Sequence, residues 1–175
     1  KLVSQLRQTL HPQVTLSLHT NGVLALKKRR ELALYDKVCL SLPSFNPLTY
    51  GRLMGVAKPP DVQALAELLG ARLKISCVVA EENREEIPQF LARCQALGIG
   101  RVVLRYLVGC QQRWPLFGEQ QPGLFYKGQP VYQVGGMEVT VWEFERCQST
   151  SLNLFADGTI GCSYLLQQTA GFETT

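Results

Sequence analysis

Residues 72–109, RLKISCVVAEENREEIPQFLARCQALGIGRVVLRYLVG, decide the fold of this chain. Two nearly continuous apolar runs, 72–80 and 101–109, are typical of buried strands, and the stretch between them has the spacing of an amphipathic helix. An acidic first turn suits the helix dipole, and Gly98 provides a helix stop. A strand, a helix and a second strand of this kind predict a parallel pair with the helix as crossover.

The residues before this unit predict the same alternation. Asp61 is expected to cap a helix that Gly70 ends, and the Pro-, Asn- and Gly-rich stretch 44–60 is interpreted as a loop. The other expected elements are a helix over 1–10, a strand over 14–20 before the turn Asn21-Gly22, a helical segment over 24–36 with Leu24, Leu32 and Leu34 toward a core, and a strand over 37–44. The fold class is therefore α/β, with four parallel strands.

The pattern changes in the C-terminal third of the chain. Residues 110–130 show no hydrophobic period and are interpreted as a long loop. Alternation around Gly135-Gly136 and around Asp157-Gly158 predicts two β-hairpins. We therefore expect two parts, an α/β part over 1–109 and an appendage of small β-hairpins over 110–175.

Composition narrows the class of protein. Of the 175 residues, 46% are hydrophobic and 18% are charged, which is typical of a globular chain. No apolar run is long enough to span a membrane, and no signal peptide is visible. The net charge of +4 is too small to indicate nucleic-acid binding, and the basic run 27–30 is interpreted as a solvated helix face. We expect neither a nucleic acid nor a membrane as partner.

The cysteines and the first residue carry two further expectations. No two of the six cysteines stand closer than fifteen positions, which excludes CxxC sites. Wide spacing and apolar flanks predict buried, reduced thiols at Cys39, Cys77 and Cys94, and a cytoplasmic location. The chain begins at Lys1 without an initiator Met, from which we expect a fragment of a longer protein.

Candidate site residues follow from the direction of the strands. Ligands of parallel α/β folds bind at the carboxyl ends of the strands. This edge is expected to carry His19, Thr20, Asn21, Ser41, Ser44, Glu81, Glu82, Asn83, Arg105 and Tyr106. Each has an ordinary alternative as a turn or capping residue. No nucleophile elbow, Walker loop or GxGxxG stretch is present, so the chain looks like a binding half-site without a reactive group.

Four segments carry signatures in a fixed order. LSLHTNG (16–22) ends a hydrophobic run in Thr-Asn-Gly, and DKVCLSLPSFNPLTYGRLMG (36–55) has a Ser-Leu strand end, a Tyr and a late Met-Gly. LKISCVVAEENREEIPQFLARCQALGI (73–99) and RVVLRYLVG (101–109) follow. In this order they resemble strands three to six of the radical S-adenosylmethionine (radical SAM) enzymes. The resemblance covers residues 1–109 and implies half of a (β/α)6 partial TIM barrel.

The resemblance also implies roles at the strand ends. The implied cofactor-binding residues are Thr20 and Asn21 at the ribose of S-adenosylmethionine, Ser41 at its carboxylate, Val79 at the adenine through its backbone, Asn83 in the turn that follows, and Arg105 on the far side. A hydroxyl and an amide at adjacent strand ends suit the polar groups of one ligand, and apolar walls suit a purine.

The sequence departs from the family at two points. The CxxxCxxC loop that holds a [4Fe–4S] cluster is absent, and we expect it upstream of Lys1. Pro43 replaces the usual Asp after Ser41-Leu42. The resemblance implies a parent enzyme that reductively cleaves S-adenosylmethionine to a 5′-deoxyadenosyl radical, which then takes hydrogen from an unidentified substrate. The chain alone is expected to be inactive.

The segment CQSTSLNLFADGTIGCSYLL (147–166) is similar to hairpins that ligate an auxiliary iron–sulfur cluster in many radical SAM proteins. That likeness makes Cys147 and Cys162 candidate cluster ligands, with Cys110 as a third. The alternative is ordinary cysteines at a hairpin.

Two other functions stay open. The first is an activating enzyme for a glycyl-radical partner, although the residues after 109 count against it. The second is a degenerate barrel that serves as a non-catalytic binding module. Whichever applies, the exposed edge of the strand VTLSL (14–18) predicts self-association.

Overall fold

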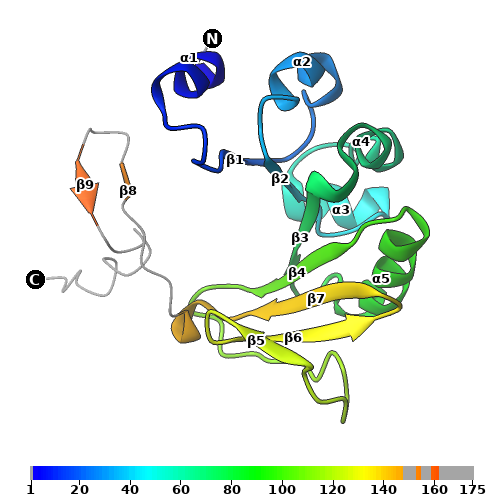
Figure 1. The fold of residues 1–175 in the computed structure, drawn as a ribbon. Helices are drawn as coiled ribbons and strands as arrows, with labels where there is room; N and C mark the ends of the chain where they lie inside the picture. The colour runs from blue at the N-terminus through cyan, green and yellow to red at the C-terminus, as the bar shows by residue number, and fades with distance from the viewer. Residues whose placement is uncertain (1, 148–152, 155–158, 162–175) are drawn as a thin grey trace, which may run out of the picture.

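The computed structural model describes residues 2–147, 153–154 and 159–161. A seven-stranded sheet organises them, in the order β1-β2-β3-β4-β7-β6-β5 (Figure 1). Its strands are β1 (Ser17–Thr20), β2 (Lys37–Ser41), β3 (Leu73–Val79), β4 (Arg101–Tyr106), β5 (Leu124–Tyr126), β6 (Gln129–Val134) and β7 (Met137–Trp142). Two short strands, β8 (Asn153–Leu154) and β9 (Ile160–Gly161), form a separate antiparallel pair. That pair confirms the strands of the second predicted hairpin, whose turn lies outside the described residues.

The strands β1 to β4 are parallel neighbours in chain order, as predicted. Each strand pairs with the next one along the chain, so this part of the sheet is wound in a single direction. The α-helices are α1 (Leu2–Thr9), α2 (Arg29–Leu32), α3 (Pro47–Met54), α4 (Val62–Leu69) and α5 (Ile87–Ala96). The 3-10 helices are η1 (Leu26–Lys28), η2 (Gly70–Arg72), η3 (Arg84–Glu86) and η4 (Phe144–Arg146). Figure 1 shows α3, α4 and α5 along one side of the sheet.

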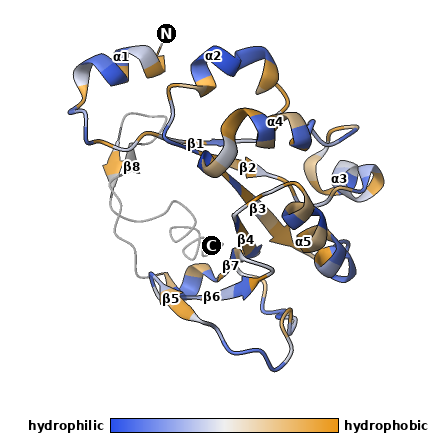
Figure 2. Ribbon diagram, turned by 45° about the vertical axis from the view of Figure 1, so that its right-hand side comes forward, coloured by the Kyte–Doolittle hydropathy of each residue, from blue (hydrophilic) through white to orange (hydrophobic). Residues whose placement is uncertain are grey.

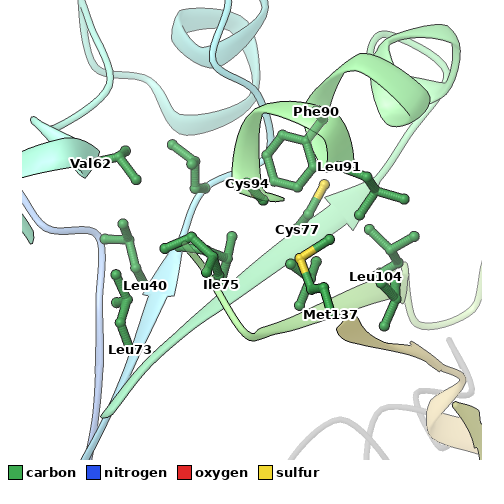
Figure 3. Close-up of a cluster of buried hydrophobic side chains, with 14 of the residues drawn as sticks. Leu40, Val62, Leu73, Ile75, Cys77, Phe90, Leu91, Cys94, Leu104 and Met137 are labelled. Carbon is green, nitrogen blue, oxygen red and sulfur yellow. The ribbon is translucent and has the colours of Figure 1, made fainter. Parts of the chain in front are cut away.

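The side of the sheet that faces these helices holds the core. Alternate residues of β3, such as Ile75 and Cys77, are fully buried there, together with Leu104 of β4. Figure 3 shows them packed with Phe90 and Cys94 of α5. Cys77 and Cys94 are therefore core residues, as predicted. Figure 2 shows β3 as mostly hydrophobic, whereas the short helix α2 is mostly hydrophilic.

Cys39 is buried too, at 1% exposed, but it lies outside this core. Its neighbours in β2, Val38 and Leu40, belong to the helix-side core, so the pleat turns Cys39 to the opposite face. The prediction that Cys39 is buried is confirmed, but its surroundings are the polar face of the sheet described below.

The largest difference from the predicted elements is α3, which lies in the stretch 44–60 that we interpreted as a loop. Asn46 accepts a hydrogen bond from the backbone N–H of Leu48, Pro47 occupies the first turn, and Gly55 ends the helix with φ +67°. Asn and Pro are common in turns, but here they form a helix start. The residues that indicated a loop are thus the capping signals of a helix.

Two smaller corrections concern the segments 24–36 and 110–130. The first contains only η1 and the single turn α2, with Leu32 buried and Leu24 56% exposed. The second contains the strand β5, which pairs with β6. Two of the four residues of α2 are arginines and a third is Glu31, so only Leu32 of this helix is buried.

The hairpin β6–β7 forms around Gly135-Gly136 as predicted, but it joins the main sheet. β7 runs parallel to β4, with Val103 beside Thr140, and Val139 belongs to the same core as the first four strands. The parallel part of the sheet therefore includes a strand from the expected appendage. In the part of the chain that the structure describes, no helix has the length and apolar character needed to cross a membrane.

Candidate ligand site on the open face of the sheet

The turn after β1 is built by the Thr-Asn-Gly stretch. The Thr20 hydroxyl oxygen accepts from the N–H of Gly22 at 3.1 Å, and Asn21 Oδ1 accepts from the N–H of Val23 at 3.2 Å. Gly22 has φ +78°, and a Cβ there would lie 2.6 Å from Leu40 Cδ1. Only glycine fits this position without a shift of its neighbours. These bonds use the Asn21 side-chain oxygen and leave its exposed amide nitrogen free to donate to a ligand.

Ser41 lies at the end of the neighbouring strand. Thr20 is in register with Leu40, so Asn21 and Ser41 directly follow a paired position at the carboxyl ends of β1 and β2. The Ser41 side chain is half-buried, and its hydroxyl makes no hydrogen bond within the described residues. The fold therefore brings these two predicted residues to one edge, each with a polar atom available.

Asn83 and Val79 hold the fold at this edge. Asn83 is fully buried and donates to the carbonyls of Pro43 at 2.7 Å and Val78 at 2.8 Å, while its Oδ1 accepts from the N–H of Ala80 at 2.8 Å. The Val79 side chain packs in the helix-side core, which leaves only its backbone at the edge. Asn83 thus ties the loop after β2 to the end of β3, and its bonds position other residues.

The face of the sheet opposite α3, α4 and α5, which we call the open face, carries a cavity of about 540 Å³. Arg105 of β4 lines this cavity. The cavity wall includes five basic side chains, Lys37, Lys74, Arg101, Arg105 and Lys127, and one carboxylate, Glu138. Trp142 and Tyr126 line it as well, beside His19 and Cys39. Of the residues predicted for the cofactor, Arg105 is the one that lines this cavity.

Burial and nearby charges shift the pKa values of three side chains on this face. Burial lowers the pKa of Lys74, and the positive charges of Arg105 and Arg101 lower it further. Burial lowers the pKa of His19, and the positive charges of Arg105 and Lys74 lower it further, so the neutral imidazole is favoured at neutral pH. Burial raises the pKa of Cys39, against the charges of Lys74 and Arg105. The open face is therefore an electropositive region that still carries neutral polar groups.

A larger cavity, of about 650 Å³, lies beside α5 and the loop after β2. Its polar groups already bond one another: the Ser44 hydroxyl donates to Glu86, and Thr49 donates to the same carboxylate at 2.6 Å. Ser44 also accepts from the N–H of Asn46 at 2.9 Å. These bonds join α3 to η3, so we assign this cluster to the fold and the open face to function.

The other strand-end candidates also have partners in the fold. Glu81 forms an ion pair with Arg84 at 2.9 Å, and the Tyr106 hydroxyl donates to the carbonyl of Trp114 at 2.7 Å. Glu82 is exposed.

The candidate cluster cysteines are only partly within the described residues. Cys110 and Cys147 are half-buried, and Cys162 lies outside the described residues. Arg113 joins the two segments, because its guanidinium bonds the carbonyl of Cys110 and pairs with Glu143 at 3.6 Å. No group of three metal-ligating side chains is present among the described residues. The auxiliary cluster thus stays a prediction.

No protein-family model matches the chain, and no curated protein matches it. Its function is therefore inferred from the residues and their geometry. Sequence reasoning missed Lys74, Arg101 and Cys39 as open-face residues, although the alternation of LKISCVV (73–79) carried the signal: its even-numbered residues include Lys74 and Ser76.

Proposed function

We propose that this chain is the second half of the partial barrel of a radical SAM enzyme and binds S-adenosylmethionine at the carboxyl ends of β1 to β3. The observation that carries the proposal is the winding of the sheet. The strands β1 to β4 are parallel and adjacent in chain order, as in a barrel, whereas a doubly wound nucleotide-binding sheet reverses its strand order at the ligand site.

The residues at the strand ends fit S-adenosylmethionine. The amide nitrogen of Asn21 and the hydroxyl of Ser41 project from neighbouring strands without partners among the described residues, and can bond the ribose and carboxylate. The backbone of residues 78–80 would border the adenine, and Arg105 would close the far side. Thr20 and Asn83 shape the edge through the bonds described above, so we assign them positioning roles.

The catalytic iron–sulfur cluster does not fit this chain. No three of its cysteines have the CxxxCxxC spacing, and the described residues contain no cluster of metal-ligating side chains. The ligands would come from outside the chain. The activity of the whole protein would be the reductive cleavage of S-adenosylmethionine that such a cluster drives, and this chain would supply the binding and orientation of that cofactor.

The test is calorimetric titration of the chain with S-adenosylhomocysteine, which shares the adenosine and amino-acid groups but cannot be cleaved to a radical. Asn21→Asp keeps the oxygen that caps the turn and removes the amide donor, and Ser41→Ala removes the free hydroxyl. Each is expected to weaken binding about tenfold. Ser4→Ala, at an exposed serine of α1, is the matched control.

Two results would contradict the proposal. The first is no binding by a chain that still melts cooperatively, which would favour the non-catalytic binding module. The second is a chain that, after anaerobic reconstitution with iron and sulfide, assembles a reducible cluster and cleaves S-adenosylmethionine without further protein.

A further inference from the structure

The open-face cavity carries an excess of unpaired positive charge. In the part of the chain that the structure describes, the ion pairs use Arg7, Lys28, Arg84, Arg113 and Arg146 as cations. None of the five basic residues that line the cavity takes part in an ion pair there. Cations that share one cavity repel one another, and an anionic ligand would remove that repulsion.

Arg105 contributes a buried hydrogen-bond donor that has no acceptor among the described residues. Its Nε is fully buried and has no hydrogen-bond partner, one of two such side-chain atoms among the described residues. The other, Tyr50 Oη, belongs to a residue of the helix-side core, whereas Arg105 lines the cavity. A buried N–H without a partner is costly, and the planar guanidinium matches the two oxygens of a phosphate or carboxylate.

Neighbouring strands bring further cations to this face, because the β3–β4 register sets Lys74 next to Arg101, four residues before Arg105 in β4. Arg105 and Lys74 both lower the pKa of His19, and Arg105 lowers that of Lys74, so their charges act on one region of the face. Arg101 lies on the same side of β4 as Arg105, two pleats earlier. A guanidinium and an ammonium over one patch fit a ligand with more than one oxyanion charge.

The shape of the cavity favours a small molecule. Its volume of about 540 Å³ lies in the range of small-molecule sites. Tyr126 and Lys127, at the β5–β6 turn, border it on one side, and Trp142 of β7 provides a flat apolar wall.

We propose that this cavity binds a small molecule with at least two oxyanion charges, either a phosphate ester or a polycarboxylate. That this ligand is the substrate of the reaction rests on the function proposed above, whereas its binding does not. The cavity wall runs from the first residues of the strands, such as Lys37 and Arg101, to Arg105 near the carboxyl end of β4.

Calorimetric titrations of the chain with pyrophosphate and with citrate test the proposal. Lys74→Gln and Arg105→Gln are expected to weaken binding of the preferred anion about tenfold each. Glu138→Gln, which removes the one carboxylate of the cavity, is expected to strengthen it about threefold. Arg52→Gln is the matched control, because Arg52 is an exposed cation of α3 on the helix-covered side.

Preference for pyrophosphate would identify a phosphate ester, and preference for citrate a polycarboxylate; both support the proposal. It is overturned if neither anion binds, if Arg52→Gln weakens binding as much as Lys74→Gln, or if single-stranded DNA binds more tightly than either anion. S-adenosylhomocysteine is titrated in parallel. Its binding without anion binding refutes this inference alone, and anion binding without it refutes the proposed function alone.

Discussion

The two faces of the sheet use alternate residues of the same strands for opposite purposes. On β3, Ile75 and Cys77 are buried against the helices, while Lys74, the residue before Ile75, faces the open side with a lowered pKa. Among the described residues, the core of the helix-covered face contains no charged side chain. The open face has five cations along one cavity and a buried Nε without a partner. The first face therefore stabilises the fold, and the second is available for ligands.

The largest effect is expected from a substitution that creates a cavity in the core of the helix-covered face. Ile75→Ala removes a fully buried side chain from the centre of the core and should lower the free energy of unfolding by about 2–5 kcal/mol. Lys74→Gln, one residue away on the other face, should change it by less than about 1 kcal/mol because Lys74 has no ion pair to lose. Urea unfolding followed by circular dichroism measures both. Equal losses would contradict the division between the faces.

The next effect concerns Asn83, which ties the loop after β2 to the end of β3. Asn83→Ala leaves the carbonyls of Pro43 and Val78 without their buried donor, and should cost about 1–3 kcal/mol of unfolding free energy. Asn83→Asp keeps the oxygen that accepts from Ala80 but buries a charge, so we expect a larger loss. If Asn83→Ala leaves stability unchanged and abolishes S-adenosylhomocysteine binding, Asn83 is a ligand contact and our positioning role is wrong.

How much of this could be predicted from sequence differs between the faces. The helix-covered face follows from hydrophobic patterns in the sequence. Apolar runs such as Leu73–Val79 predicted the four parallel strands, and amphipathic spacing with capping residues predicted α4 and α5. Helix α3 was not, because Asn46 and Pro47 are common to loops and to helix starts. The open face was harder: strand ends indicated Asn21, Ser41 and Arg105, but the placement of Lys74 beside Arg101 depends on strand register, which a single sequence does not specify.

The rates at which the cysteines react with a thiol reagent test the burial of both faces without a mutation. Cys77 and Cys94 are fully buried, and burial raises the pKa of both, that of Cys94 to about 12. Cys39 is buried on the other face, and burial raises its pKa as well. Under native conditions, iodoacetamide should modify the half-buried Cys110 and Cys147 at least about tenfold faster than these three, as mass spectrometry of peptides can determine. Rapid modification of Cys39 would show that the open face is not packed as described.

The smallest effect is expected at the edge of the sheet. Among the described residues β1 pairs only with β2, so its other edge is open to a second copy of the chain. We expect weak, concentration-dependent association in sedimentation velocity, reduced by Val14→Lys beside this strand. Leu48→Lys, at an exposed leucine of α3, is the matched control. A monomer at all concentrations, or equal effects of both substitutions, would exclude pairing through β1.

Mapping where S-adenosylhomocysteine binds tests most directly whether the carboxyl ends of β1 to β3 form the cofactor site. In a titration of the isotope-labelled chain with S-adenosylhomocysteine, followed by amide chemical shifts, we predict the largest changes at Asn21, Gly22, Ser41 and residues 78–80. These amides belong to three different strand ends that only the parallel sheet brings together. Changes confined to the helix-covered face, or none at millimolar ligand, would contradict the claim that this edge is a binding site for S-adenosylmethionine.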